Sequence, residues 1–220
     1  MQIHYFKYQD YNLPFYFIEN KNVSKIQMKM DKLLVYCSSI NEAHLILKNI
    51  SSKWIERYIF NLKNFINDFN NEFKLFDNLM FYEFNSTLKS IFIYSKKDYK
   101  LIATILCNNQ TQVISKVKAY ALNLLKQRIS LIQDNVEKDF NITSIPFSFK
   151  DVSSYYGQYN KTKHKITYNK NIYCYNDQIL KAIIAHEIVH SLTKNGHGKD
   201  FYNLLLKYMP NYKMTMQTIL

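Results

Sequence analysis

The order His-Glu-Ile-Val-His at positions 186–190 constrains the fold more than any other feature of this chain. Two histidines four residues apart lie on one face when the segment is helical, because an α-helix advances by about one turn over that interval. The surrounding stretch from Asp177 to Leu192 contains neither proline nor glycine and is apolar around most of its circumference. Such a stretch is typical of a buried helix, and Asp177 is its expected N-cap.

Histidines and a glutamate inside a buried helix are costly unless they are paired or bound to a metal. His186 and His190 can reach one ion, and His197, seven residues after His190, can supply a third ligand. Asn195 and Gly196 tolerate the positive φ that often ends a helix, so we expect the chain to turn back there. A catalytic zinc requires three protein ligands and one open position. The spacing therefore predicts a Zn²⁺ site formed by the three histidines.

Glu187 follows the first of these histidines, where it can hold a water molecule at the metal and take its proton. We expect Glu187 to be the general base of a zinc-dependent hydrolase. The alternative interpretation is an amphipathic helix whose histidines are ordinary hydrogen-bonded core residues. Half of the six histidines fall within a window of twelve residues, together with a suitably placed glutamate, and this favours the metal site.

After His197, apolar residues recur at helical spacing through Phe201, Leu205 and Tyr208, and Pro210 ends the pattern. We expect this second helix to pack on the first and to set the position of His197. Asp200 is expected to be an acidic residue in the first helical turn rather than a partner of a ligand imidazole.

The C-terminal third resembles the YgjP-like metallopeptidase-type family and, more distantly, the SprT-like zinc proteins. The residues that carry the resemblance are His186-Glu187-x-x-His190, Asn195-Gly196-His197-x-x-x-Phe201 and Tyr208-Met209-Pro210-Asn211-Tyr212. Weaker similarities upstream are found at residues 26–35, 53–55 and 165–169. The resemblance implies a single domain over residues 1–220, with a β-rich N-terminal lobe over about 1–140 and a zinc-binding C-terminal lobe over about 141–220. It also implies a peptidase with a peptide or protein substrate.

One stretch departs from the family pattern. Members commonly carry Ser-Arg-Trp-Gly-Ser-Cys before the strand that precedes the HExxH helix, whereas this chain has Ser154-Tyr155-Tyr156-Gly157-Gln158-Tyr159. An arginine can bind a phosphate or carboxylate in bidentate fashion, and Tyr155 cannot. A tyrosine can donate a hydrogen bond to a developing oxyanion, but we expect Tyr155 and Tyr156 simply to pack in a β-strand. The family therefore does not fix the substrate.

The predicted reaction is hydrolysis of a peptide bond by metal-activated water, and an extended substrate could pair with the strand around Ile166–Tyr168. Two alternatives stay open. The same metal and hydroxide could hydrolyse a phosphoanhydride, as in a nucleoside triphosphate pyrophosphatase. The chain could also be a non-catalytic, zinc-stabilised module that binds nucleic acid, although an intact Glu187 argues for catalysis.

The formal net charge of +12 is compatible with binding to nucleic acid or to an anionic surface. Lysine supplies nearly all of the positive charge, since Arg57 and Arg128 are the only arginines, and the lysines are scattered along the sequence. Phosphate recognition favours arginine or a concentrated basic stripe. Nucleic acid is therefore not the favoured partner.

The three cysteines, Cys37, Cys107 and Cys174, form no CxxC pair and are expected to be small buried residues in a reducing compartment. The N-terminal residues lack the pattern of a signal peptide, and no apolar stretch reaches the length that crosses a bilayer. We therefore expect a cytoplasmic protein with no membrane partner.

The remaining pattern predicts an α+β fold, with a β-rich N-terminal lobe that includes helices and a C-terminal zincin-like lobe made of a small sheet and the HExxH helix. Strands are expected over residues 5–36, with a turn near Met30-Asp31-Lys32, and again over 75–106. A helix capped by Asn41 is expected to reach about Phe69, with room for a break. Two strands after Pro146 are expected to lead to the HExxH helix.

A long helix is expected from Thr111 to Val136. One side of it is marked by Val113, Val117, Ala121, Leu124, Arg128 and Ile132. The other histidines have no partner motif. We expect His4 and His44 to be surface or helix-face residues, and His164 to lie in an exposed charged turn.

Overall fold

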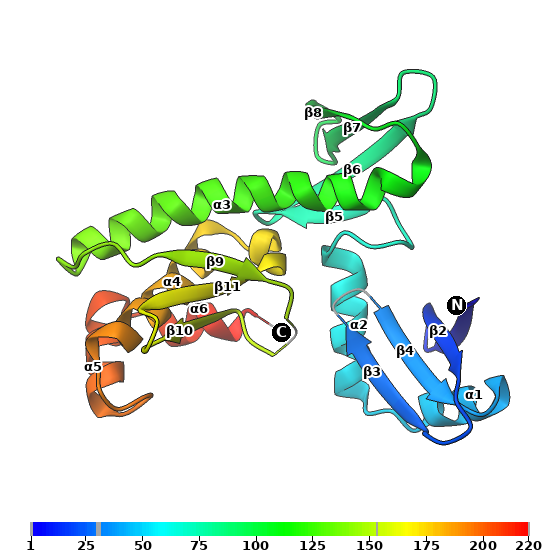
Figure 1. The fold of residues 1–220 in the computed structure, drawn as a ribbon, viewed down its shortest axis with the longest axis horizontal. Coiled ribbons are helices and arrows are strands. Elements are labelled where there is room, and N and C mark those ends of the chain that lie inside the picture. Colours follow the sequence, from blue (N-terminus) through cyan, green and yellow to red (C-terminus); the bar gives the residue numbers. More distant parts are fainter. Residues whose placement is uncertain (1, 30–31, 153, 220) are drawn as a thin grey trace. The chain divides into compact units, whose positions relative to one another are not determined.

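The computed structural model describes residues 2–29, 32–152 and 154–219 and has an α+β fold, as predicted (Figure 1). The chain divides into two compact units, Met1–Phe73 and Lys74–Leu220. Its strands are β1 (Gln2–Tyr8), β2 (Tyr11–Glu19), β3 (Lys25–Lys29), β4 (Lys32–Cys37), β5 (Glu72–Leu75), β6 (Asn78–Asn85), β7 (Ser90–Ser95), β8 (Leu101–Leu106), β9 (Phe147–Lys150), β10 (Gly157–Asn160) and β11 (Lys165–Asn169). Its helices are α1 (Ile40–Lys48), α2 (Ser52–Asn64), α3 (Val113–Asp139), α4 (Asp177–Leu192), α5 (Lys199–Tyr208) and α6 (Tyr212–Gln217), with short 3-10 helices at Gln110–Gln112 and Lys170–Cys174.

The first unit contains a four-stranded sheet in the order β1-β2-β4-β3, together with α1 and α2. Strands β2 and β4 are parallel, and the two outer pairs are antiparallel. Phe15, Val35 and Tyr58 are fully buried in its core, where the Tyr58 hydroxyl donates to the Pro14 carbonyl. The strands predicted here are confirmed. The turn predicted near residues 30–32 falls on Met30 and Asp31, which lie outside the described residues.

The helix predicted to start at Asn41 and reach about Phe69 consists of two helices, α1 and α2, and ends earlier, at Asn64. Ser39, not Asn41, caps α1, because its Oγ accepts the Glu42 N–H at 3.2 Å. At the break, the Asn49 side chain donates to a carbonyl of the preceding turn. Polar side chains that satisfy backbone groups locally favour such breaks.

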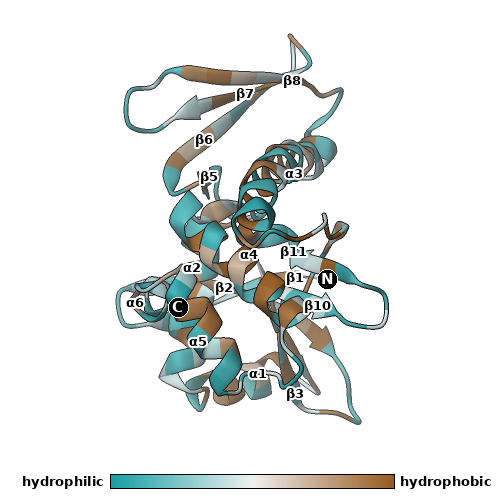
Figure 2. Ribbon diagram, turned by 90° about the vertical axis from the view of Figure 1, so that its left-hand side faces the viewer, coloured by the Kyte–Doolittle hydropathy of each residue, from teal (hydrophilic) through white to brown (hydrophobic). Residues whose placement is uncertain are grey.

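A second four-stranded sheet has the order β5-β6-β7-β8, which confirms the strands predicted over residues 75–106. Strand β7 pairs antiparallel with both β6 and β8. Ile91 and Ile93 of β7 are fully buried on one face, and apolar residues run along the sheet (Figure 2). Strand β8 forms the edge of the sheet.

The long helix α3 starts two residues later and ends three residues later than predicted. Its buried side agrees with the prediction at Val113, Val117 and Ala121, and then follows different residues. These are Leu125, Ile129, Gln133, Val136 and Glu137, in place of Leu124, Arg128 and Ile132. After Ala121 the predicted side lies one residue before the buried side, and it does not include the polar part of that side, Gln133 and Glu137.

That polar part is a hydrogen-bonded network. The Gln133 side chain donates to Glu137 Oε1 and to the Ile145 carbonyl, each at 2.6 Å. It accepts from the Tyr168 hydroxyl at 2.9 Å, and the Ile145 N–H donates to Glu137 at 2.9 Å. Because every bond is made between buried groups, the network ties α3 to the strand β11 that precedes α4.

The third sheet has the order β10-β11-β9, so three strands rather than the predicted two lead to α4. Strand β11 pairs antiparallel with β10 and parallel with β9. The prediction that a substrate could pair with Ile166–Tyr168 is therefore wrong, because both edges of β11 are already occupied. Strand β10 forms one edge of this sheet and β9 the other, and both β10 and α3 pack against α4 (Figure 1).

Cys37, Cys107 and Cys174 are free thiols and are buried, as predicted. Among the described residues, no helix combines the length and the apolar character that crossing a membrane requires.

Candidate metal centre

Helix α4 carries His186, Glu187 and His190, and most of its other residues are buried. Its N-cap is Asn176, whose side chain accepts the Ile179 N–H at 3.1 Å, and not Asp177 as predicted. Asp177 is instead the first helical residue, where a negative charge is favourable to the helix dipole.

The chain returns toward α4 through a turn that precedes His197. Helix α4 ends at Leu192, as predicted, and Thr193 adopts an extended backbone. Gly196 has a φ of +28°, and the Gly198 N–H donates to the Asn195 carbonyl at 3.0 Å. The expected positive φ is therefore found at Gly196, although in a turn beyond the helix rather than at its C-cap.

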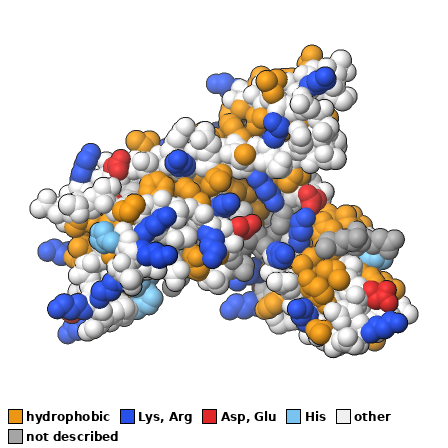
Figure 3. Space-filling model, in the orientation of Figure 1, with side chains coloured by type: hydrophobic (Ala, Val, Ile, Leu, Met, Phe, Trp, Pro, Cys, Tyr) orange, Lys and Arg blue, Asp and Glu red, His pale blue; other side chains and the backbone are white. Residues whose placement is uncertain are grey.

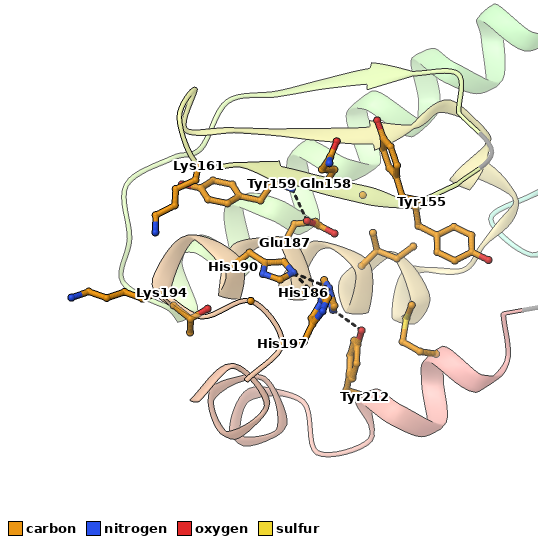
Figure 4. Close-up of a pocket in the computed structure, with 16 residues that line it drawn as sticks. Tyr155, Gln158, Tyr159, Lys161, His186, Glu187, His190, Lys194, His197 and Tyr212 are labelled. Carbon is orange, nitrogen blue, oxygen red and sulfur yellow. Dashed lines mark hydrogen bonds between the residues drawn. The ribbon is translucent and has the colours of Figure 1, made fainter. Parts of the chain in front are cut away.

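The structure brings His186, His190 and His197 together (Figure 4). Their Nε2 atoms form a triangle with sides of 3.1 Å (His186–His190), 3.1 Å (His190–His197) and 3.0 Å (His186–His197). Three nitrogens bound to a tetrahedral zinc at about 2.0–2.1 Å lie roughly 3.3 Å apart, so the triangle needs to widen by only a few tenths of an ångström. The three side chains form a group that could hold a metal ion.

The protonation states of these rings suit a metal. Burial, together with the neighbouring His190 and His197, lowers the pKa of His186 to about 3. Burial and the charge of His197 also lower the pKa of His190. Both rings are therefore neutral at pH 7, and a neutral imidazole can offer an Nε2 lone pair to a cation.

Tyr212, at the start of α6, holds the ring of His186. Its hydroxyl oxygen lies 2.7 Å from His186 Nδ1 (Figure 4). Burial raises the pKa of Tyr212 to about 12, so the phenol stays protonated. An imidazole that offers Nε2 to a metal carries its proton on Nδ1 and donates it to such a partner. No local pattern in the sequence indicates this role, although Tyr212 ends the stretch Tyr208-Met209-Pro210-Asn211-Tyr212 that carries the family resemblance.

Phe201 of α5 forms an apolar support for the three imidazoles. It is fully buried, and its ring centroid lies 4.9 Å from His186, 4.5 Å from His190 and 5.0 Å from His197. The predicted helix after His197 is thus present and contacts the histidines through this residue. Asp200 lies exposed in the first turn of α5, as predicted.

Glu187 is 5% exposed, and its side chain extends from α4 to strand β10. Its Oε2 accepts the Tyr159 N–H at 2.7 Å. Burial raises the pKa of Glu187 to about 7, and the bond from Tyr159 opposes the rise. A carboxylate with such a pKa is suited to accept a proton near neutral pH.

Gly157, at the start of β10, allows this approach. A Cβ added there would lie 2.7 Å from Glu187 Cγ and 3.0 Å from Oε1. A glycine inside a strand often marks such a close contact. In the sequence, Gly157 stands out only as a match to the family pattern, and nothing there connects it with Glu187.

The three histidines and Glu187 line a cavity of about 560 Å³. Its wall also includes Tyr155, Tyr156, Gly157, Gln158, Tyr159, Lys161, Ile183, Thr193, Lys194, Gly196, Tyr212 and Met216. Lys161 and Lys194 lie toward one end and Tyr155 toward the other (Figure 4). The prediction that Tyr155 and Tyr156 pack within a strand is wrong, because β10 begins only at Gly157 and both tyrosines face the cavity.

The other three histidines lie outside this centre. His164 is in the exposed turn between β10 and β11, as predicted, with Nδ1 2.7 Å from the Tyr159 hydroxyl. His4 and His44 are half-buried in the first unit, where each ring packs against Phe15.

A model of the family described as YgjP-like, metallopeptidase domain, matches residues 40–219. No curated protein matches the chain. Among solved structures, the metallopeptidase zymogen of Pyrococcus abyssi abylysin is 14% identical, with a TM-score of 0.39 over 41% of this chain and 90% of that chain. The metallopeptidase zymogen of Methanocaldococcus jannaschii jannalysin is 22% identical, with a TM-score of 0.37 over 42% of this chain and 97% of that chain.

Proposed function

The chain belongs to the YgjP-like family of metallopeptidase domains, and we propose that it is a zinc-dependent metallopeptidase. His186, His190 and His197 hold the ion, and Glu187 is the general base. The observation that carries the proposal is the convergence of three Nε2 atoms in the wall of the cavity that Glu187 also lines. We further assign the sheet β10-β11-β9 and helices α4 to α6 to a zincin-like lobe that begins at about residue 141.

Zinc at this position would act as a Lewis acid and would lower the pKa of a water molecule to about 7. Glu187 accepts the proton of the attacking water. Its Oε2 is bonded to the Tyr159 N–H, which leaves Oε1 as the oxygen for this transfer. The same oxygen then gives the proton to the departing amine. Tyr212 and Phe201 act earlier, by fixing the histidine rings before substrate arrives.

The proposed substrate is a peptide in extended conformation that lies along β10. This strand forms one edge of its sheet, it packs against α4, and its residues line the cavity. An edge strand offers backbone groups with which an extended peptide can pair. The scissile peptide bond of the substrate would then lie next to His186, Glu187 and His190.

The first test is the metal content of the purified protein by elemental analysis. We expect one zinc per chain in the wild type and a sharp reduction in His197→Ala. Absence of zinc from the wild type, even after zinc is supplied, would contradict the assigned ligands.

The second test separates metal binding from catalysis. Glu187→Gln is expected to retain zinc and to lose about 10²–10⁴-fold in peptide hydrolysis, measured by mass spectrometry of a peptide mixture. Glu83→Gln, which changes an exposed glutamate of β6, is the matched control and should leave hydrolysis unchanged. Undiminished turnover in Glu187→Gln would exclude the general-base role. If the protein hydrolyses nucleoside triphosphates and cleaves no peptide, the proposed peptidase activity is wrong and the protein is a pyrophosphatase.

A further inference from the structure

The cavity of the candidate metal centre carries its positive charge at one end. Lys161 and Lys194 line it there, and Tyr155 lies at the other end (Figure 4). Of the described residues in its wall, Glu187 is the acidic one. Basic side chains also recur on the visible surface of β9 to β11 and α4 to α6, and acidic ones are few (Figure 3). An anionic group of a ligand is therefore favoured at the lysine end.

The two lysines come from opposite sides of the cavity. Lys161 directly follows β10, and Lys194 lies in the turn between α4 and α5. The Asn160 side chain accepts the Lys163 N–H at 2.8 Å and so fixes the turn that holds Lys161. Beside Lys194, the Thr193 hydroxyl donates to a carbonyl of the last turn of α4 at 2.9 Å. Within the described part of the chain, neither lysine forms an ion pair, so both ammonium groups are available to a ligand.

The pairing of β10 with β11 determines which backbone groups of β10 face its open edge. The Tyr156 carbonyl accepts the Asn169 N–H at 2.9 Å. Opposed residues of an antiparallel pair alternate between bonded and non-bonded pairs, so Gly157 and Tyr159 belong to non-bonded pairs. Their N–H and C=O groups therefore point away from β11, in agreement with the bond from the Tyr159 N–H to Glu187. A peptide N–H can reach the two carbonyls at this edge.

Antiparallel pairing with this edge sets the direction of a bound peptide. Antiparallel pairs are slightly more stable per residue than parallel ones. Strand β10 runs from Gly157 to Asn160 and so leads toward Lys161. A peptide of opposite direction places its N-terminal part beside Lys161 and Lys194, and its C-terminal part toward Tyr155. The peptide residues that reach the lysines therefore precede the scissile bond.

From these observations we propose that the chain selects peptides with an acidic side chain on the N-terminal side of the scissile bond, and that Lys161 and Lys194 recognise this side chain. The proposal rests on the proposed peptidase function and specifies its substrate class. Both lysines are exposed, so each ion pair with the substrate changes kcat/KM by about 2–5-fold and is weakened by salt. The two together give a preference of about tenfold.

Matched peptides test the preference. Cleavage sites in a peptide mixture are mapped by mass spectrometry, and one cleaved peptide is remade with glutamate or glutamine before the scissile bond. We expect kcat/KM to be about tenfold higher for the glutamate peptide at low salt, and the ratio to fall as salt is added. A glutamate moved to the C-terminal side should lose the advantage. Equal rates for the glutamate and glutamine peptides, or a preference for glutamate after the bond, would overturn the proposal.

Charge reversal tests the two lysines. The double variant Lys161→Glu, Lys194→Glu should cleave the glutamate peptide more slowly than the glutamine peptide, so that the ratio of their kcat/KM values inverts. Lys97→Glu makes the same change of charge at an exposed position in the turn between β7 and β8 and should retain the wild-type ratio. A double variant with the wild-type ratio would show that other residues recognise the peptide.

Binding distinguishes failure of this proposal from failure of the peptidase function. Glu187→Gln should bind a fluorescently labelled glutamate peptide about tenfold more tightly than its glutamine counterpart, as measured by anisotropy. If the wild type cleaves no peptide while this difference persists, the peptidase function is wrong and the acidic subsite stands. Cleavage of both peptides with equal rates and equal affinities would overturn the subsite and leave the peptidase function in place.

Discussion

Replacing Gly157 by alanine should displace the carboxylate of Glu187. The added Cβ would lie 2.7 Å from Glu187 Cγ, which is closer than such atoms approach. Glu187 has little freedom to move, because it is buried and bonded to the Tyr159 N–H. The backbone of Gly157 is outside the left-handed region, so alanine adds no backbone strain. The steric contact therefore accounts for the whole effect.

The magnitude follows from two contributions. Overpacking of a filled interior costs about 1–3 kcal/mol. Loss of the bond between Tyr159 and the carboxylate would add about 1.5–3 kcal/mol. For a chain of this size, each kcal/mol lowers the melting temperature by roughly 2–4 °C. A shift of about 1 Å in a reacting group lowers turnover by about 10²-fold, so Gly157→Ala should lose that much activity while retaining zinc.

A double-mutant cycle identifies the cause. Scanning calorimetry of the wild type, Gly157→Ala, Glu187→Ala and the double variant measures the cost of the alanine with and without the glutamate side chain. We expect Gly157→Ala to be destabilising in the wild type and nearly neutral in the Glu187→Ala background. An equal cost in both backgrounds would refute the steric explanation. Loss of zinc in Gly157→Ala would show that the substitution disturbs the histidines as well.

Three further predictions concern other contacts. Tyr212→Phe removes the hydroxyl at His186 Nδ1 and should weaken zinc binding about 10–100-fold in a chelator competition assay; unchanged affinity would argue against the contact. Removal of zinc by a chelator should lower the melting temperature of the wild type but not of His186→Ala, and equal shifts would place the stabilising ion elsewhere. Glu137→Ala leaves the buried donors of Gln133 and Ile145 unpaired and should cost about 1–3 kcal/mol per group in denaturant unfolding; a stability within error of the wild type would contradict the network.

The convergence of His186, His190 and His197 could be predicted from the sequence because the three residues are close together in it. His186 and His190 need only a helix to share a face, and a positive φ at Gly196 lets the chain turn back toward them. Both conditions are local, and local patterns are what a sequence displays most directly.

Contacts between distant segments were not predicted. Tyr212 lies 26 residues after His186, and Tyr159 lies 28 residues before Glu187. No periodicity connects such positions, since their distance depends on how whole elements pack. The glycine at 157 carried a signal, because a glycine at a strand start indicates close approach, but its partner could not be identified without the fold.

The buried side of α3 was mispredicted for a different reason. Hydrophobic periodicity assumes that buried positions are apolar. Leu124 and Leu125 are both apolar, so the pattern alone does not decide which of them continues the buried side. Gln133 and Glu137 are buried because their hydrogen bonds are made internally, which an apolar pattern does not indicate. The strand that contains Tyr168 determines which face of α3 is buried, and that strand is far away in the sequence.

The hydrogen bond from the Tyr159 N–H to Glu187 means that the residues proposed to bind the metal and the group that positions Glu187 come from different parts of the chain. The three histidines and Tyr212 lie within one continuous segment near the C-terminus, whereas the group that positions the base belongs to an earlier strand. Under the proposed function, substitutions in that strand are expected to abolish turnover and to leave metal affinity intact. Under the proposed function, the presence of the three histidines alone would therefore not identify a chain that hydrolyses peptides.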